Sequence, residues 1–340
     1  MAVSERRIAV VGLGSIGRRH ARLLRDRAGV KVELVEANAD ALSRAQQELG
    51  LLRAHDTFEK MLKTRPDAVW IATPPQAHVE QTVQAVEAGA HVFCEKPMST
   101  TLAEGLRMRD AAHRHGRIIN IGFVNHFHPG LRRIRELIST DQLGMVLHVH
   151  SRMGAYVILK NSISRYQSRL PGSLFLDCTH QADAYFWLTG QIPTEISTVA
   201  RESGRLELSS NPNLAVVTCE YESPMISTIH LNFVQSPIRQ EYEIVGDRGW
   251  VHWDCMSQTL RIGRTDAAEI ATESVAVEDV DDLYRAEHQA FFNSIDGKRA
   301  PETSAEDGLA SMAMCDAMIQ SYESGGSTCA VASVSDLGFQ

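Results

Sequence analysis

The sequence lacks the features that would point to a membrane, a disulfide-stabilised or a nucleic-acid-binding protein. No apolar run approaches the ~20 residues that span a bilayer, and no hydrophobic leader precedes the first apolar segment at residue 8. The six cysteines are widely spaced without a C-x-x-C pair, which indicates neither a disulfide framework nor a zinc site. Acidic residues outnumber Lys and Arg by 42 to 34, and the net charge of −8 argues against a polyanionic partner. We therefore expect a cytoplasmic protein that binds neither membranes nor nucleic acid.

What is present is the composition and length of a two-domain globular chain. The 340 residues are 44% hydrophobic and 22% charged, which excludes wholesale disorder. Up to residue 122, short β-branched apolar runs alternate with amphipathic stretches; the runs are residues 7–11, 30–35, 68–72, 91–94 and 118–121. This rhythm predicts a doubly wound parallel sheet covered by helices, which is an α/β fold. We place the first domain at residues 1–122.

The pattern changes in residues 123–340, where long alternating segments replace the strand–helix rhythm. Residues 145–150 and 228–233 alternate apolar and polar side chains, and five further candidate strands lie between residues 195 and 263. Consecutive strands joined by short turns predict a large, mainly antiparallel sheet. Helices are expected at residues 174–188, 283–295 and 305–322. The second domain is thus predicted to be α+β.

A glycine motif follows the first predicted strand and opens a helix. Gly12, Gly14 and Gly17 form G-x-G-x-x-G, with Ser15 and Ile16 between the last two. In this context the glycines permit a tight turn, close approach of a pyrophosphate and helix–strand packing, which predicts a Rossmann dinucleotide site. Glu36 ends the second strand, where a carboxylate accepts the ribose hydroxyls and repels a 2′-phosphate. We expect NAD as cofactor, with NADP as the alternative.

Two further clusters lie at the carboxyl ends of predicted parallel strands, where open α/β sheets bind their ligands. Thr73-Pro74-Pro75 and His78 follow the strand at 68–72, and Glu95-Lys96-Pro97 follows the strand at 91–94. With the glycine motif, these clusters resemble the glucose–fructose oxidoreductase/inositol dehydrogenase/MocA (Gfo/Idh/MocA) family. The resemblance extends over nearly the whole chain and includes Gly122-Phe123, the segment from Gly172 to Asp183, and Glu306-Asp307-Gly308.

The resemblance implies a set of site residues. Lys96 would lie beside the nicotinamide and the reacting carbinol, as a proton acceptor or as a hydrogen-bond donor to the oxygen, with Pro97 in a cis peptide bond. His180 would be the general base. Asp177 lies three residues before His180, whereas many relatives have the catalytic aspartate four residues before the histidine. Both spacings place the two residues near the same helical face, so Asp177 would orient His180 or pair with it. Asp183 would hold sugar hydroxyls, with a structural role as the alternative.

The remaining candidates lie in the loops after the two strands or in the segment ahead of Asp177. Thr73, Pro74, Glu95 and His78 would line the cofactor site, with a structural role as the alternative for His78. Tyr166 and Arg169 precede the Asp177 segment and would contact the substrate, or lie in a solvated loop. No metal site is expected, because His148 and His150 alternate on a strand without a nearby carboxylate.

The function implied is an NAD-dependent dehydrogenase acting on CH–OH groups of a sugar, cyclitol or sugar derivative. Two alternatives are an NAD-dependent glycosidase with transient oxidation and a non-catalytic, NAD-binding sugar sensor. The partner is a small polyhydroxylated substrate, and the resemblance also implies a homodimer or homotetramer formed through the C-terminal sheet.

Overall fold

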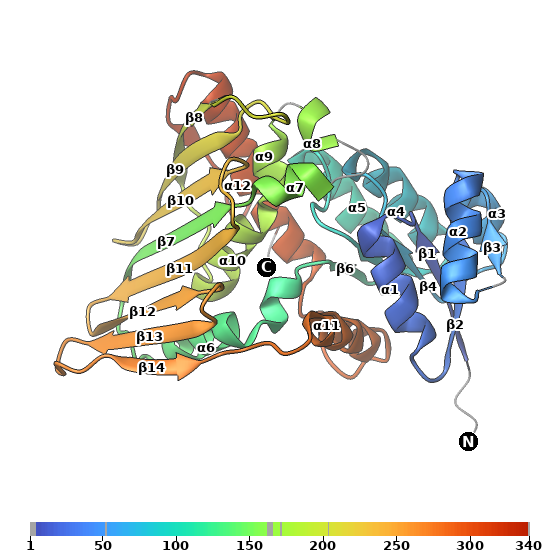
Figure 1. Ribbon diagram of the computed structural model, residues 1–340, viewed down its shortest axis with the longest axis horizontal. Coiled ribbons are helices and arrows are strands. Elements are labelled where there is room, and N and C mark those ends of the chain that lie inside the picture. The colour runs from blue at the N-terminus through green and yellow to red at the C-terminus, as the bar shows by residue number, and fades with distance from the viewer. Residues whose placement is uncertain (1–4, 52, 162–165, 171, 203, 339–340) are drawn as a thin grey trace. The chain divides into compact units, whose positions relative to one another are not determined.

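The fold is described from a computed structural model, which covers residues 5–51, 53–161, 166–170, 172–202 and 204–338 (Figure 1). Contacts divide the chain into two compact units. The first comprises residues 1–124 and 279–309, and the second comprises residues 125–278 and 310–340. The first unit therefore includes residues 279–309, a segment that the sequence analysis placed in the second domain. Within the described ranges, no helix combines the length and hydropathy needed to cross a membrane.

The first unit contains a parallel sheet with the strand order β3-β2-β1-β4-β5-β6 in the described residues. Its strands are β1 (Arg6–Val11), β2 (Val30–Val35), β3 (Ala54–His55), β4 (Ala68–Ile71), β5 (His91–Cys94) and β6 (Ile119–Ile121). Its helices are α1 (Ser15–Arg25), α2 (Ala39–Leu49), α3 (Phe58–Leu62), the 3₁₀ turn η1 (Pro75–Ala77), α4 (His78–Glu87), α5 (Leu102–His115) and α11 (Val280–Ile295). The order reverses beside β1, as expected for a doubly wound sheet.

An aromatic cluster joins α11 to the centre of this sheet. Trp70 of β4 and Phe93 of β5 are fully buried and stack with ring centroids 5.4 Å apart. Phe291 of α11 meets Trp70 edge to face at 5.0 Å, and Phe292 packs beside it. Burying large aromatic side chains is among the strongest contributions to a core, so α11 is an integral part of the first unit.

The second unit is built on a nine-stranded sheet, counted in the described residues, with the order β14-β13-β12-β11-β7-β10-β9-β8-β15. Its strands are β7 (Val146–Gly154), β8 (Glu195–Arg201), β9 (Leu214–Glu220), β10 (Ile226–Asn232), β11 (Arg239–Gly246), β12 (Gly249–Asp254), β13 (Thr259–Arg264), β14 (Ala271–Ser274) and β15 (Cys329–Ala330). Only the β10–β7 pair is parallel among these pairings. The predicted fold class is therefore confirmed.

Helices cover one face of the large sheet (Figure 1). They include α6 (Pro129–Ser139), α9 (Ser173–Asp177), α10 (Thr179–Thr189) and most of α12 (Ala305–Glu323). The other short helices are η2 (Val124–Phe127), which begins at the last residue of the first unit, α7 (Tyr156–Asn161) and α8 (Tyr166–Arg169). The helix expected at 174–188 is interrupted at Cys178, whose ψ of +23° separates α9 from α10. Asp177, Cys178 and Thr179 are three successive poor helix formers, which accounts for the break.

Candidate active site

The glycine turn between β1 and α1 is packed on one side and open on the other. Gly12 has a φ of +85°, and a Cβ there would lie 2.7 Å from the carbonyl oxygen of Ala72. A Cβ on Gly17 would lie 1.8 Å from the carbonyl oxygen of Gly12, whereas a Cβ on Gly14 would meet no atom within 4 Å. Gly12 and Gly17 are thus required by packing within the turn. Gly14 leaves room for a ligand to approach the backbone.

The amino terminus of α1 has no side-chain cap. Gly14 is the N-cap residue, and Ser15 and Ile16 open the helix. The first N–H groups of a helix need external acceptors, and together with the helix dipole they form an anion site. The turn and the uncapped helix end therefore fit the pyrophosphate of a dinucleotide.

Glu36 lies across the turn from this helix end. Its Oε2 accepts a hydrogen bond from the N–H of Leu13 at 3.0 Å, and its Oε1 accepts one from the N–H of Asn38 at 3.0 Å. The carboxylate is half-buried and oriented by these two backbone donors. Because each carboxylate oxygen has more than one lone pair, the group can still accept ribose hydroxyls. The residues present therefore fit NAD.

His78 joins the loop after β4 to the loop after β5. Its Nε2 lies 2.9 Å from the carbonyl oxygen of Thr73, and its Nδ1 lies 2.8 Å from that of Pro97. The ring is 1% exposed, and burial lowers the pKa of His78. Thr73 also donates from Oγ1 to Gln81 at 2.7 Å. Each ring nitrogen of His78 thus lies within hydrogen-bonding distance of one of the two loops that carry the predicted site residues, and the neutral ring can donate to one of the two carbonyl groups. Pro74 is exposed beside them.

Glu95 and Lys96 follow β5 directly, and the Lys96–Pro97 peptide bond is cis. Glu95 is 9% exposed. Its Oε2 accepts from the main-chain N–H of Lys96 at 3.2 Å, and its Oε1 lies 2.8 Å from Nε2 of His20 on α1. A Cβ on Gly122 would lie 3.0 Å from this carboxylate, which gives a packing reason for the glycine of the Gly122-Phe123 motif.

The second unit carries the other predicted site residues. Asp177, 8% exposed, ends α9, and the half-buried His180 is the second residue of α10, so the break at Cys178 lies between them. Their predicted proximity on one helical face assumed a continuous helix, which the structure does not have.

Asp183 lies deeper in α10 than its predicted contact with sugar hydroxyls implies. It is fully buried, and its carboxylate lies 2.9 Å from Nε2 of His126. His126 in turn stacks on Trp187 with ring centroids 4.3 Å apart. The sequence analysis did not include His126 among the site residues, and no local pattern marks it.

The remaining expectations concern α8, metals and cavities. Tyr166 and Arg169 are the first and last residues of α8, but their side chains lie outside the described part of the structure. The described residues contain no group of three His, Cys, Asp or Glu side chains able to hold a metal ion.

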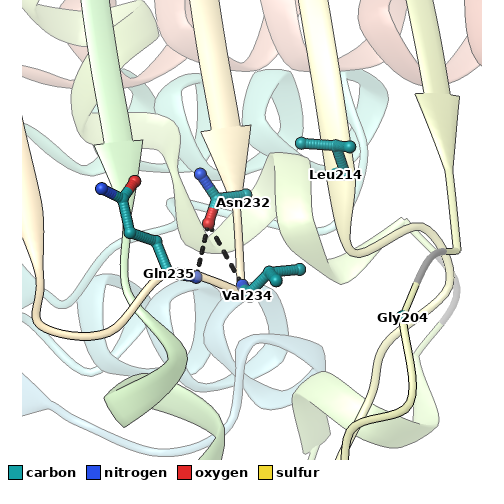
Figure 2. Close-up of a pocket in the computed structure, with 5 residues that line it drawn as sticks. All are labelled: Gly204, Leu214, Asn232, Val234 and Gln235. Atoms are coloured by element: carbon teal, nitrogen blue, oxygen red, sulfur yellow. Dashed lines mark hydrogen bonds between the residues drawn. The ribbon is translucent and has the colours of Figure 1, made fainter.

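A hollow of about 380 Å³ lies at the end of β10 (Figure 2); its lining residues, none of them predicted for the site, are Gly204, Leu214, Asn232, Val234 and Gln235. Asn232 holds the loop there by accepting from the N–H groups of Val234 and Gln235 at 3.1 and 2.8 Å.

These features define the first unit as a dinucleotide-binding domain of the kind found in oxidoreductases. The sequence profile of the oxidoreductase family with an NAD-binding Rossmann fold matches residues 6–123, and the profile of its C-terminal alpha/beta domain matches residues 135–331. The chain therefore belongs to the Gfo/Idh/MocA oxidoreductase family, as the resemblance implied. It is an oxidoreductase, and its cofactor is NAD.

Named relatives extend over nearly the whole chain. Inositol 2-dehydrogenase 3 of Saccharopolyspora erythraea is 26% identical over 328 residues, which cover 94% of each chain. Myo-inositol 2-dehydrogenase of Thermotoga maritima is 27% identical over 316 residues, covering 89% of this chain and 92% of the relative.

Solved structures share the fold. An oxidoreductase from Agrobacterium radiobacter, in complex with NAD+, L-tartaric acid and magnesium, has a TM-score of 0.86 at 14% identity, covering 96% of this chain and 98% of the other. Scyllo-inositol dehydrogenase from Lactobacillus casei, with bound NAD(H) and scyllo-inositol, has a TM-score of 0.80 at 22% identity, covering 96% and 99%. Neither the glycosidase nor the sensor alternative is represented among these relatives.

Proposed function

We propose that the protein is an NAD-dependent dehydrogenase that oxidises a secondary alcohol of a sugar, cyclitol or sugar derivative. The observation that carries the proposal is the placement of Lys96. It follows β5 at the same edge of the parallel sheet at which the glycine turn follows β1, with β4 between the two strands. An amine is thus held at the ligand-binding edge of a dinucleotide fold. The inositol dehydrogenases among the relatives support a polyhydroxylated substrate.

The proposed reaction requires the chain to handle one proton. The glycine turn and Glu36 would hold NAD, which would supply the acceptor for the hydride of the carbinol C–H. The hydroxyl proton passes to a base, so that the products are a ketone, NADH and a proton. We assign His180 as this base, because an imidazole exchanges protons near neutral pH, and Asp177 as the group that orients it. Lys96 binds the reacting oxygen, either as a hydrogen-bond donor or as part of the proton path.

Cofactor preference and substrate contacts complete the proposal. The carboxylate of Glu36, fixed by two backbone donors, would repel the 2′-phosphate of NADP and favours NAD. Thr73, Pro74, His78 and Glu95 belong to the loops that bound the cofactor site. Asp183, Tyr166 and Arg169 are the predicted substrate contacts.

The test is an NAD-coupled absorbance screen across inositols, aldoses, sugar acids and sugar nucleotides, followed by variants. We expect Lys96→Ala and His180→Ala each to abolish NADH formation while NADH binding, followed by fluorescence, stays close to that of the unmodified protein. His115→Ala, at an exposed position on α5, is the matched control and should retain activity. Turnover at the unmodified rate in either of the first two variants would show that the assigned roles are wrong.

We further propose that the large sheet joins subunits and that the protein is cytoplasmic. Val199, Val216 and Ile226 lie on outward-facing strand positions and are 61%, 48% and 50% exposed. Apolar side chains gathered on one sheet face are typical of a subunit interface. In the described part of the structure no two of the six cysteines form a disulfide, which suits a reducing compartment. Light scattering should show a dimer or tetramer, and Val216→Glu should shift it toward monomer; a monomeric unmodified protein would exclude this interface.

A further inference from the structure

Three buried polar side chains of the first unit form a hydrogen-bonded chain that ends at the backbone of Lys96. His288 of α11, 2% exposed, places Nε2 2.7 Å from Nδ1 of His20, which is fully buried on α1. Nε2 of His20 lies 2.8 Å from Oε1 of Glu95, and Oε2 of Glu95 accepts from the N–H of Lys96 at 3.2 Å. The chain thus links two helices to the loop that carries the lysine.

The direction of the bond to Glu95 follows from its chemistry. A carboxylate has only acceptor sites, so Nε2 of His20 is the donor whether the ring is neutral or protonated. The proton between His20 and His288 can belong to either ring. Burial, together with the neighbouring His20, holds the pKa of His288 well below its ordinary value, so His288 is neutral. Bonds of this kind to a buried charged group are among the stronger hydrogen bonds in proteins.

Aromatic side chains enclose the two imidazoles. Phe93 meets His20 edge to face at 5.2 Å, Trp70 meets His288 at 5.5 Å, and Tyr284 meets His20 at 5.6 Å. In such a shell an unpaired polar group is costly, so removing one member leaves its partner unsatisfied. The carboxylate of Glu95 therefore depends on His20 for its position, and the backbone of Lys96 depends on Glu95.

We propose that His20 is a positioning residue for Lys96: by fixing the carboxylate of Glu95 it fixes the main chain from which the Lys96 amine extends. His288 serves the same purpose one step further away, by orienting the ring of His20. The kinetic part of this inference rests on the proposed dehydrogenase function. The structural part does not, because the hydrogen bond from the N–H of Lys96 to Glu95 is made between residues of the first unit itself.

The test compares leucine and glutamine at each histidine. His20→Leu removes the donor to Glu95, whereas in His20→Gln the Nε2–H₂ group can still donate to it. His288→Leu and His288→Gln make the same comparison at the far end, since glutamine offers both a donor and an acceptor. Phe292→Leu is the control for loss of core packing, because Phe292 lies on the same helix as His288 but takes no part in the hydrogen-bonded series of His288, His20 and Glu95.

The first readout is amide hydrogen exchange of Lys96, resolved by fragmentation of the peptide that spans residues 92–99. We expect the Lys96 N–H to exchange roughly tenfold or more faster in His20→Leu, because the Glu95 carboxylate that accepts from it is no longer held by His20, and we expect slow exchange to be largely restored in His20→Gln. Phe292→Leu should leave Lys96 exchange unchanged when compared at equal margins below each variant's Tm. Unchanged exchange in His20→Leu, or equal acceleration in the control, would overturn the proposal.

The second readout is steady-state kinetics with NAD and the best polyol found in the screen. We expect His20→Leu to lower kcat about tenfold with little change in the KM for NAD, and His20→Gln to recover most of it. A rise in KM for NAD with unchanged kcat would mean that His20 supports the cofactor turn instead, and would overturn the assignment. If no alcohol is oxidised by the unmodified protein, the proposed function fails, and hydrogen exchange alone decides the positioning role.

Discussion

Replacing Gly14 or Gly17 with alanine should separate ligand binding from folding within one turn. The two glycines stand three residues apart, yet their surroundings differ. The Cβ of Gly14→Ala would point into open space, whereas that of Gly17→Ala would lie 1.8 Å from the carbonyl oxygen of Gly12. Ordinary contact begins near 3.4 Å, so α1 must move by more than an ångström to admit the second methyl group. The first methyl group requires no such movement.

The expected magnitudes follow from this difference. Overpacking costs about 1–3 kcal/mol, which lowers the Tm of a domain of this size by roughly 2–12 °C for Gly17→Ala. Gly14→Ala should change the Tm little, because a small loss of N-cap preference is offset by reduced freedom of the unfolded chain. In Gly14→Ala the added methyl group would instead meet the pyrophosphate when NADH binds. The same cost of about 1–3 kcal/mol then raises the Kd for NADH roughly 5- to 150-fold.

Differential scanning fluorimetry and titration of NADH fluorescence measure the two effects separately. We expect both variants to bind NADH poorly but only one to lose stability. Gly14→Ala keeps its Tm, while Gly17→Ala is destabilised and binds poorly because the helix end has moved. A Gly14→Ala variant that binds NADH as tightly as the unmodified protein would show that the phosphates do not lie on the open side of the turn. A Gly17→Ala variant with an unchanged Tm would refute the packing argument.

Three further predictions concern single side chains. Glu36→Ala should raise NADP affinity relative to NAD in paired titrations; an unchanged ratio would remove Glu36 from cofactor selection. His128 accepts a hydrogen bond from the N–H of Gly130 at 3.0 Å, and burial lowers the pKa of His128 to about 4. The neutral ring therefore contributes fully to stability above the pKa of the unfolded chain, about 6.5, and this contribution is lost as the pH falls toward 4. His128→Asn, which keeps an acceptor, should flatten the Tm-versus-pH curve in that window, and an unaltered slope would contradict this. Asp183→Asn should lower the Tm, because an amide oxygen is a weaker acceptor for Nε2 of His126 than the carboxylate it replaces, with a raised polyol KM only if the predicted substrate contact exists; an unchanged Tm would contradict the pairing.

The parallel sheet and the glycine turn could be predicted because their signals are local. Strand runs, helix caps and the G-x-G-x-x-G spacing all act within a few residues of one another. The five expected strands match β1, β2, β4, β5 and β6, whereas the two-residue strand β3 was not predicted. Helix α5, for example, begins where Thr101 accepts from the N–H of Glu104 at 3.3 Å, as the capping-box pattern indicates. The sequence also pointed to the loops after β4 and β5, because the carboxyl ends of parallel strands share one edge.

What could not be predicted depends on pairs that are distant along the chain. The interruption at Cys178 ends α9 and starts α10 between Asp177 and His180, and helical spacing alone gave no sign of it. The bond between His126 and Asp183 joins η2 to α10. The packing of these two helices decides whether Asp183, three residues after His180, faces solvent or the core. Periodicity shows which face of a helix is apolar, but not which buried polar group will meet it.

The position of α11 shows how this long-range packing reaches the candidate site. Trp70 and Phe93 lie in the central strands of the first unit, and Phe291 of α11 packs against both. That contact brings a helix from late in the chain onto the N-terminal sheet, and the same helix carries His288 to His20. The geometry of the Lys96 loop therefore depends on residues from both ends of the sequence. A truncated chain ending after β6 would retain the glycine turn but lose His288 and the aromatic cover of the sheet, so we expect it neither to fold as a stable unit nor to hold Lys96 as the full chain does; a folded, NADH-binding fragment of this kind would contradict the argument.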